Sequence, residues 1–157
     1  MKPKAWEKTL DERLPLFGHR NWIVVADAAY PAQSGHGIET IVSGVSQQVA
    51  IKTVLARLRV CKHVHPVIHV DRELALVDEK DAPGIDSYRN WLKGALKGLS
   101  VTMTPHDEII SKLDHAARMF SILIVKSTMA IPYTSVFIEL DCGYWNADAE
   151  ARLRSRI

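Results

Sequence analysis

The sequence is organised around one buried strand that ends in an acidic residue. Residues 22–26 form a continuous apolar run, Trp-Ile-Val-Val-Ala, which is too short for a helix and rich in β-branched side chains. A run of this kind predicts a strand that is covered on both faces, as in the parallel sheet of an α/β protein. Asp27 follows directly, where open α/β sheets carry functional groups, and the Pro-, Ser- and Gly-containing segment 28–37 predicts a loop.

Strand patterns and helical patterns alternate along the rest of the chain. Such alternation predicts a three-layer α/β/α single domain over residues 1–157, with a mainly parallel sheet and functional side chains in the loops after its strands. After residues 100–104, Thr104 is a candidate N-cap and Pro105 suits the first position of a helix. Helices are expected at 5–16, after an N-cap at Ser46, at 85–99, at 105–117 and from Asn146 onward, and strands or short apolar segments at 39–42, 63–70, 100–104, 120–125 and 136–140.

The composition is that of an ordinary globular protein and excludes several classes of partner. Of 157 residues, 47% are hydrophobic and 24% charged, and the net charge of +2 is too small to indicate nucleic-acid binding. The basic tail with Arg152, Arg154 and Arg156 is interpreted as a solvated helix face. No apolar run approaches the roughly 18 residues of a membrane span. The polar N-terminus, with only Cys61 and Cys142 as cysteines, predicts a cytoplasmic protein without disulfides.

Four residues in the expected loops are candidates for chemistry. His19 precedes the first strand and is either a turn residue or a general acid or base, because imidazole exchanges protons near neutral pH. Asp27 is either a turn residue or a carboxylate that orients a histidine or binds a ligand hydroxyl. His106, at a helix start, either lies on the surface or meets a small ligand at the sheet edge. Tyr133 either packs or, with the hydroxyls of its loop, binds a sugar.

A second group of residues has the pattern of a metal site. If residues 63–71 form a strand, then His63, His65, His69 and Asp71 share one face, because side chains alternate with a period of two. Imidazole and carboxylate suit zinc, but the hydrolase barrels that begin with such histidine pairs need about 250 residues. A half-exposed or interface face is therefore favoured, and no metal is expected. Motifs for nucleotide binding, zinc proteases and serine hydrolases are absent.

Motifs from separate parts of the chain point to one family. The segment GHRNWIVVADAAYP covers residues 18–31, and PAQS at 31–34 and SYRN at 87–90 are similar to fucose-type members. TPHD at 104–107 is similar to ribose-type members, and PYTS at 132–135 precedes the last strand. In this order the motifs resemble the ribose pyranase and fucose mutarotase (RbsD/FucU) family over about residues 10–143. Residues 144–157 extend past the usual end.

The resemblance implies a cofactor-independent sugar isomerase, a mutarotase or pyranase that interconverts anomeric or ring forms of a free monosaccharide. It implies His19 as the proton-transferring catalytic residue and Asp27, His106, Tyr133 and Ser135 as substrate-binding residues. It implies neither a cofactor nor a metal. It also implies a homo-oligomer, with a decamer as one form, whose pocket is completed at the subunit interface.

Two departures and one geometric constraint limit this assignment. Ser135 stands where the family carries an asparagine, and Lys126 stands near a usual arginine, so the motifs do not name the sugar. A non-catalytic sugar-binding or regulatory role stays open, and a metal-dependent hydrolase is the less favoured alternative. His19 and Asp27 flank a strand whose ends lie roughly 20 Å apart. They converge only if the chain turns back before Trp22 or a second subunit supplies one of them.

Overall fold

A six-stranded sheet forms the centre of the molecule, with strand order β2-β5-β1-β6-β3-β4. The computed structural model describes residues 2 and 4–157. β6 runs antiparallel to both of its neighbours, β1 and β3, whereas the other pairs are parallel. The mainly parallel sheet is thus confirmed, with one reversed strand inside it. The strands are β1 (Trp22–Ala26), β2 (Ile38–Val42), β3 (Val64–Asp71), β4 (Ser100–Thr104), β5 (Ile122–Lys126) and β6 (Val136–Cys142).

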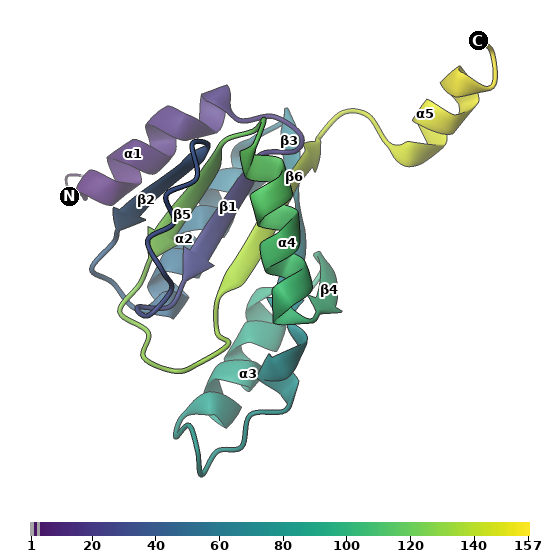
Figure 1. The fold of residues 1–157 in the computed structure, drawn as a ribbon. Coiled ribbons are helices and arrows are strands. Elements are labelled where there is room, and N and C mark those ends of the chain that lie inside the picture. The colour runs from purple at the N-terminus through teal and green to yellow at the C-terminus, as the bar shows by residue number, and fades with distance from the viewer. Residues whose placement is uncertain (1, 3) are drawn as a thin grey trace.

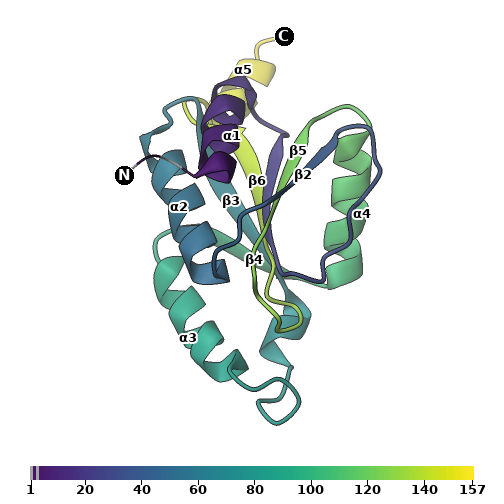
Figure 2. The same ribbon diagram turned by 90° about the vertical axis from the view of Figure 1, so that its left-hand side faces the viewer.

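Helices cover both faces of the sheet, which confirms the three-layer α/β/α arrangement. Figure 2 shows α1, α2 and α3 on one side of the sheet and α4 alone on the other. No helix in the described part of the chain is long and apolar enough to cross a membrane. The helices are α1 (Ala5–Arg13), α2 (Gln47–Val60), α3 (Ile85–Ala95), α4 (His106–Ala117) and α5 (Ala147–Arg154), with short 3₁₀ helices η1 (Leu14–Leu16) and η2 (Arg72–Ala75).

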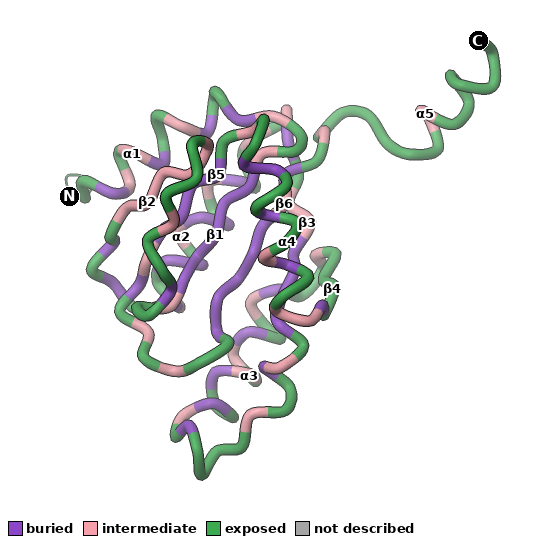
Figure 3. The backbone as a smooth tube through the Cα atoms, in the orientation of Figure 1, coloured by how far each residue is buried: buried purple, intermediate pink, exposed green. Residues whose placement is uncertain are grey.

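β1 is buried along its whole length, which explains its continuous apolar sequence (Figure 3). Ile23 and Val25 point into the core beneath α1, α2 and α3. Trp22, Val24 and Ala26 point into a second core beneath α4. The two cores hold β1 rigidly in place, so the position of the residue that follows it, Asp27, is well defined.

The reversed strand β6 brings late residues of the chain to the carboxyl ends of β1 and β3. Val136, at its amino end, pairs with Val25 on one side and with Val70 on the other. Residues 133–135, which lead into β6, therefore lie beside Asp27 and near Asp71, although they are distant from both in sequence.

The local signals at the helix starts are confirmed at α2 and wrong at α4. The Ser46 hydroxyl accepts a hydrogen bond from the Val49 amide at 3.2 Å, as expected for an N-cap. At α4, however, Thr104 belongs to β4 and Pro105 occupies the cap position without a side-chain cap bond. The carboxylate of Glu73 takes over this task, because both of its oxygens accept from the His106 amide at 3.1 Å.

Gln47 connects three segments near the carboxyl end of β1. Its side chain is fully buried, and Nε2 donates to the carbonyls of Val25 at 3.0 Å and of Thr134 at 2.8 Å. Its Oε1 accepts from the Ser127 hydroxyl at 2.6 Å. One amide thereby fixes the connection between β5 and β6 against β1.

Replacement of Gln47 by leucine is expected to destabilise the fold by about 2–3 kcal/mol, because buried carbonyl and hydroxyl partners lose their hydrogen bonds. Urea unfolding measures the change. The matched control Gln48→Leu alters the partly exposed neighbouring side chain and should stay within about 0.5 kcal/mol of the wild type. Equal effects of the two substitutions would contradict the role given to Gln47.

Candidate functional site

Four of the five residues expected to form a site gather at one edge of the sheet. Asp27 follows β1, His106 begins α4 after β4, and Tyr133 and Ser135 precede β6. The parallel strands end and β6 begins at this edge, so side chains from distant segments meet there. His19, the fifth residue, lies elsewhere.

Asp27 and Ser135 form the first hydrogen-bonded pair of the cluster. The Ser135 hydroxyl donates to Asp27 Oδ1 at 2.8 Å and accepts from the Asp27 amide at 3.1 Å. Asp27 Oδ2 accepts from the Ala29 amide at 3.2 Å. A carboxylate offers about four acceptor sites, so the half-buried Asp27 keeps acceptor capacity for a ligand hydroxyl.

Tyr133 is presented by a constrained turn. Its backbone φ of 58° lies in the left-handed region that non-glycine residues seldom occupy. The next residue holds this geometry, because the Thr134 carbonyl accepts from the Tyr88 hydroxyl at 2.6 Å as well as from Gln47. The Tyr133 ring stays 40% exposed and lies edge-on to the His106 ring, with centroids 5.7 Å apart. The turn thus fixes an accessible aromatic ring beside an imidazole.

His106 and Asp71 form the second pair. His106 Nδ1 lies 2.9 Å from Oδ1 of Asp71, whose side chain is 1% exposed, while one third of the His106 side chain is open to solvent. Asp71 Oδ2 is buried without a hydrogen-bond partner. With Nδ1 engaged by Asp71, Nε2 is the ring nitrogen of His106 that remains for a ligand.

Burial raises the pKa of Asp71 above its ordinary value, and the carboxylates of Glu73 and Asp27 act in the same direction. The hydrogen bond and charge of His106 oppose the rise. Asp71 is therefore a buried acid whose ionised form depends on one partner, His106.

Two aromatic rings lie beneath the cluster. Phe137 packs against His106 with ring centroids 6.3 Å apart and against Tyr30 at the same separation. Burial, reinforced by the charges of Asp114, Asp71 and Asp27, raises the pKa of Tyr30, so its phenol stays protonated at neutral pH. These rings form an apolar floor under the polar groups.

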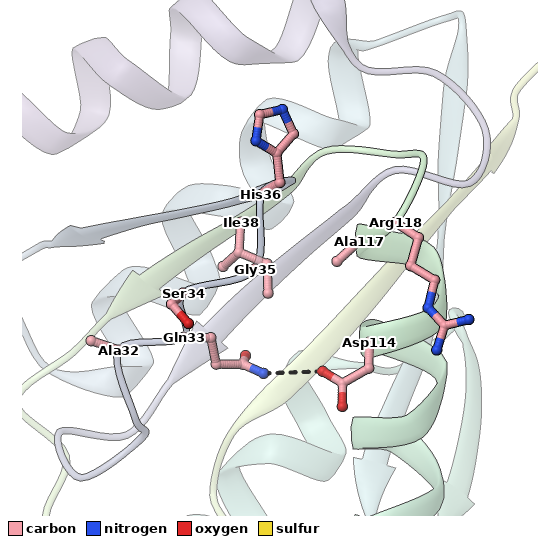
Figure 4. A pocket seen from close by; sticks show the side chains of 9 residues that line it. All are labelled: Ala32, Gln33, Ser34, Gly35, His36, Ile38, Asp114, Ala117 and Arg118. Atoms are coloured by element: carbon pink, nitrogen blue, oxygen red, sulfur yellow. Dashed lines mark hydrogen bonds between the residues drawn. The ribbon is translucent and has the colours of Figure 1, made fainter.

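The loop after β1 links the cluster to α4. The Tyr30 hydroxyl donates to Gln33 Oε1 at 2.9 Å. The Gln33 amide in turn donates to Asp114 at 3.4 Å, as Figure 4 shows. A hollow of about 520 Å³ adjoins this link, and Ser34, His36 and Arg118 help to line it (Figure 4). Polar and apolar side chains both line this hollow, and neither His106 nor Asp71 is among them.

His19 lies at the opposite end of β1 from Asp27. A turn precedes the strand. In this turn the Gly18 amide donates a hydrogen bond to Asn21 Oδ1 at 2.7 Å, and the Arg20 amide donates to the Leu140 carbonyl at 2.9 Å. β1 begins directly after this turn, so the turn does not place His19 near Asp27. His19 is exposed and separated from the cluster by the length of the strand, roughly 20 Å.

The histidines around β3 have separate partners. No group of three or more potential metal ligands gathers in residues 2 and 4–157. His63 contacts the Leu14 carbonyl at 3.1 Å, His65 contacts the Cys142 carbonyl at 3.1 Å, and His69 contacts Glu139 at 2.9 Å. Asp71 is engaged by His106 instead. His65, His69 and Asp71 alternate along β3 as expected, whereas His63 precedes the strand. Each of these side chains has a partner of its own.

Sequence reasoning missed Asp71 and Glu73 as parts of the site, although a signal for Asp71 was present. Asp71 ends β3 just as Asp27 follows β1, so the strand-end argument applies equally to both. Residue 71 pairs with Thr104 in the sheet, which places His106 beside it. For Glu73, no sequence pattern indicated that it would cap α4.

Together, fold and cluster define an α/β/α protein with paired acid/base groups at the carboxyl edge of a mixed sheet. A scan of protein-family models and a search of curated proteins found no match to the sequence. Among solved structures, Bacillus subtilis RbsD complexed with D-ribose is similar over 90% of this chain and 97% of that chain, with a TM-score of 0.63 and 15% identity.

Two fucose-type structures are similar as well. The fucose mutarotase from Streptococcus pneumoniae in complex with L-fucose has a TM-score of 0.54 and 21% identity, over 85% of this chain and 89% of that chain. FucU from Bifidobacterium longum has a TM-score of 0.55 and 16% identity, over 88% and 93%. The chain therefore has the fold of the RbsD and FucU structures, as its motifs predicted.

The raised pKa of Asp71 makes folding stability depend on pH. The folded protein binds the Asp71 proton more tightly than the unfolded chain does, so stability falls as pH rises from the ordinary aspartate value, about 4, through the raised value. Relative to the non-titrating variant Asp71→Asn, the wild type should lose free energy of unfolding across this interval.

Urea unfolding between about pH 4 and 7 measures this difference. Asp78→Asn, at an exposed loop carboxylate, is the control and should show no such trend. The account of the Asp71 pKa would be contradicted if the difference in free energy of unfolding between wild type and Asp71→Asn stayed constant with pH. It would also be contradicted if the wild type gained stability relative to Asp71→Asn as pH rises.

Proposed function

We propose that this protein interconverts anomeric or ring forms of a free monosaccharide by general acid/base catalysis, as a mutarotase or pyranase. The observation that carries the proposal is the meeting of two pairs, Asp27–Ser135 and Asp71–His106, beside the ring of Tyr133. Carboxylates and hydroxyls bind sugar hydroxyls, and imidazole transfers protons near neutral pH. The fold shared with structures that contain D-ribose and L-fucose supports this class of ligand.

The reaction opens and closes a sugar ring. A base removes the proton of the anomeric hydroxyl, the bond between the anomeric carbon and the ring oxygen breaks, and an acid protonates that oxygen. After rotation in the open-chain aldehyde, the same steps run in reverse to the other anomer, or through another hydroxyl to the other ring size. The chemistry needs no redox cofactor. Positioned acid/base groups typically contribute 10²- to 10⁴-fold, which suits a reaction that already proceeds in water.

His106 is suited to one of the two proton transfers. Asp71 engages Nδ1 and would stabilise the imidazolium form, so that Nε2 exchanges the proton with the sugar. Asp27, already oriented by the Ser135 hydroxyl and the Ala29 amide, would accept a hydrogen bond from a sugar hydroxyl. Tyr133 would pack against the sugar, with its ring held beside the imidazole.

The second proton transfer is assigned to His19 of a second copy of the chain. Within one protomer, the length of β1 keeps His19 away from Asp27, and the turn at Gly18–Asn21 does not bring it back. A homo-oligomer in which the amino end of β1 of one protomer meets the carboxyl edge of another removes this separation. The substrate pocket is then shared between two subunits.

The sugar itself is expected to be of the ribose or fucose type. Ser135 is shorter than an asparagine would be, and its hydroxyl is directed to Asp27. A panel of ribose, fucose and galactose covers the sugars that the two sets of motifs favour.

Two-dimensional exchange NMR on these three sugars is the direct assay. The wild-type protein should accelerate anomer or ring exchange of at least one of them, and His19→Ala and His106→Ala should each reduce this acceleration by roughly 10²-fold or more. His115→Ala, at an exposed histidine in the last turn of α4, is the control and should leave the rate unchanged.

Circular dichroism should show that the His19 variant stays folded, because this side chain is exposed. If a sugar binds but exchange is not accelerated for any member of the panel, the proposed isomerase activity is wrong and a sugar-binding role is favoured. A fully active His19→Ala variant would remove that residue from the mechanism.

A further inference from the structure

The C-terminal segment, residues 143–157, forms an arm that stands apart from the rest of the protein (Figure 1). Its helix α5 has only eight residues, none of them buried. Isolated helices of this length are marginal in water. The start of the helix is nevertheless capped, because Asn146 Oδ1 accepts from the Ala149 amide at 2.8 Å. The Trp145 indole donates to the Glu150 carboxylate at 2.6 Å.

The arm presents a partly exposed apolar stripe. Ala149 and Leu153 share one face of α5, and Trp145, which precedes the helix, continues the four-residue spacing. Trp145 is 45% and Leu153 46% exposed, and Ile157 beyond them is 87% exposed. Such a stripe on a short, capped helix indicates a surface that packs against another one.

An apolar groove of matching character lies between α3 and the edge strand β4. It has a volume of about 320 Å³, and seven of its nine lining residues are apolar. Val101 and Met103 of β4 are 42% and 44% exposed along it. Leu92 of α3 and Leu96, the C-cap of that helix, also line the groove. β4 is the last strand of the sheet, so its outer edge is unpaired.

The arm of the same chain is held at the wrong end of the sheet to fill this groove. The Gly143 amide donates to the His63 carbonyl at 3.0 Å, next to the start of β3, and a Cβ at this position would collide with the Lys62 carbonyl. The groove is lined by Val70, which lies six residues, or roughly 20 Å, beyond the start of β3 at Val64. Trp145 follows Gly143 by two residues, which span at most about 7 Å.

The charges of α5 and α3 are complementary when the two helices run antiparallel. Asp148 lies in the first turn of α5, and Arg152 and Arg154 lie in its last turn. Along α3 the order is the same, with Asp86 in the first turn and Lys93 in the last. An antiparallel pair therefore places each acidic end beside a basic end.

We propose that the arm of one copy of this chain docks into the α3–β4 groove of a second copy, with α5 antiparallel to α3 and its Trp145–Leu153 stripe in the groove. The contact orders α5 and covers the exposed edge of β4. It does not depend on the sugar chemistry proposed above, so each idea can fail without the other.

Cysteine cross-linking between co-expressed full-length chains tests the contact. In a Cys61→Ser, Cys142→Ser background, one chain carries Leu153→Cys and the other, distinguished by a tag, carries Met103→Cys. Mild oxidation should join residue 153 to residue 103, as identified by mass spectrometry. The yield should be at least roughly tenfold higher than with the control Val42→Cys, an exposed site on the other edge strand, β2.

Hydrogen exchange provides a second readout that needs no cysteines. The amides of α5 should be protected in the wild-type protein and should lose this protection in the full-length variant Met103→Asp, which puts a charge in the groove. Equal cross-linking yields at residues 103 and 42, or an α5 that exchanges as freely in the wild type as in Met103→Asp, would overturn the proposal.

Discussion

The antiparallel placement of β6 between β1 and β3 determines which residues of this protein can meet. A parallel strand in that position would carry residues 133–135 to the opposite edge of the sheet. Because β6 is reversed, Ser135 reaches Asp27 across 108 positions of sequence, and the Tyr133 ring reaches His106. The pairing of Val136 with both Val25 and Val70 fixes this arrangement within the sheet. The Gln47 side chain reinforces it through hydrogen bonds to the carbonyls of Val25 and Thr134.

The elements of the fold are readable from the sequence where one local cause dominates. The apolar run of β1 predicts a doubly covered strand, and the structure buries all five of its residues. Ser46 predicts the start of α2 through its cap. The direction of β6 is not readable in this way, because an apolar strand has the same pattern whichever way it runs.

The site is predictable only in part, for a related reason. Asp27, His106, Tyr133 and Ser135 were expected near strand ends and do gather there. The partnership of His106 with Asp71 depends on β3 and β4 being neighbours in the sheet, which no single segment encodes. Thr104 illustrates the same limit: it suits a cap by residue type, but Glu73 from η2 occupies that role because tertiary contacts bring it closer.

The two faces of the sheet are covered unequally, and this has a consequence for assembly. Three helices cover one face, whereas α4 alone covers the other (Figure 2). Glu139 is partly exposed and His65 is exposed. A chain built in this way has room for contacts with other copies. We propose two such places: the site, to which a second copy would bring His19, and the groove beside α3.

Subunit complementation tests most directly whether the site is shared between protomers. His19→Ala and Asp27→Ala chains, each expected to be inactive alone, are co-expressed, and sugar exchange is measured by NMR on the mixed assembly. Suppose that each site takes His19 from one copy and Asp27 from another. Of the four equally frequent pairs of chain types at such a site, one retains both residues, so random mixing restores roughly a quarter of the wild-type sites. If activity stays at the level of the separate variants, the two residues do not act across a subunit interface and the shared site is wrong.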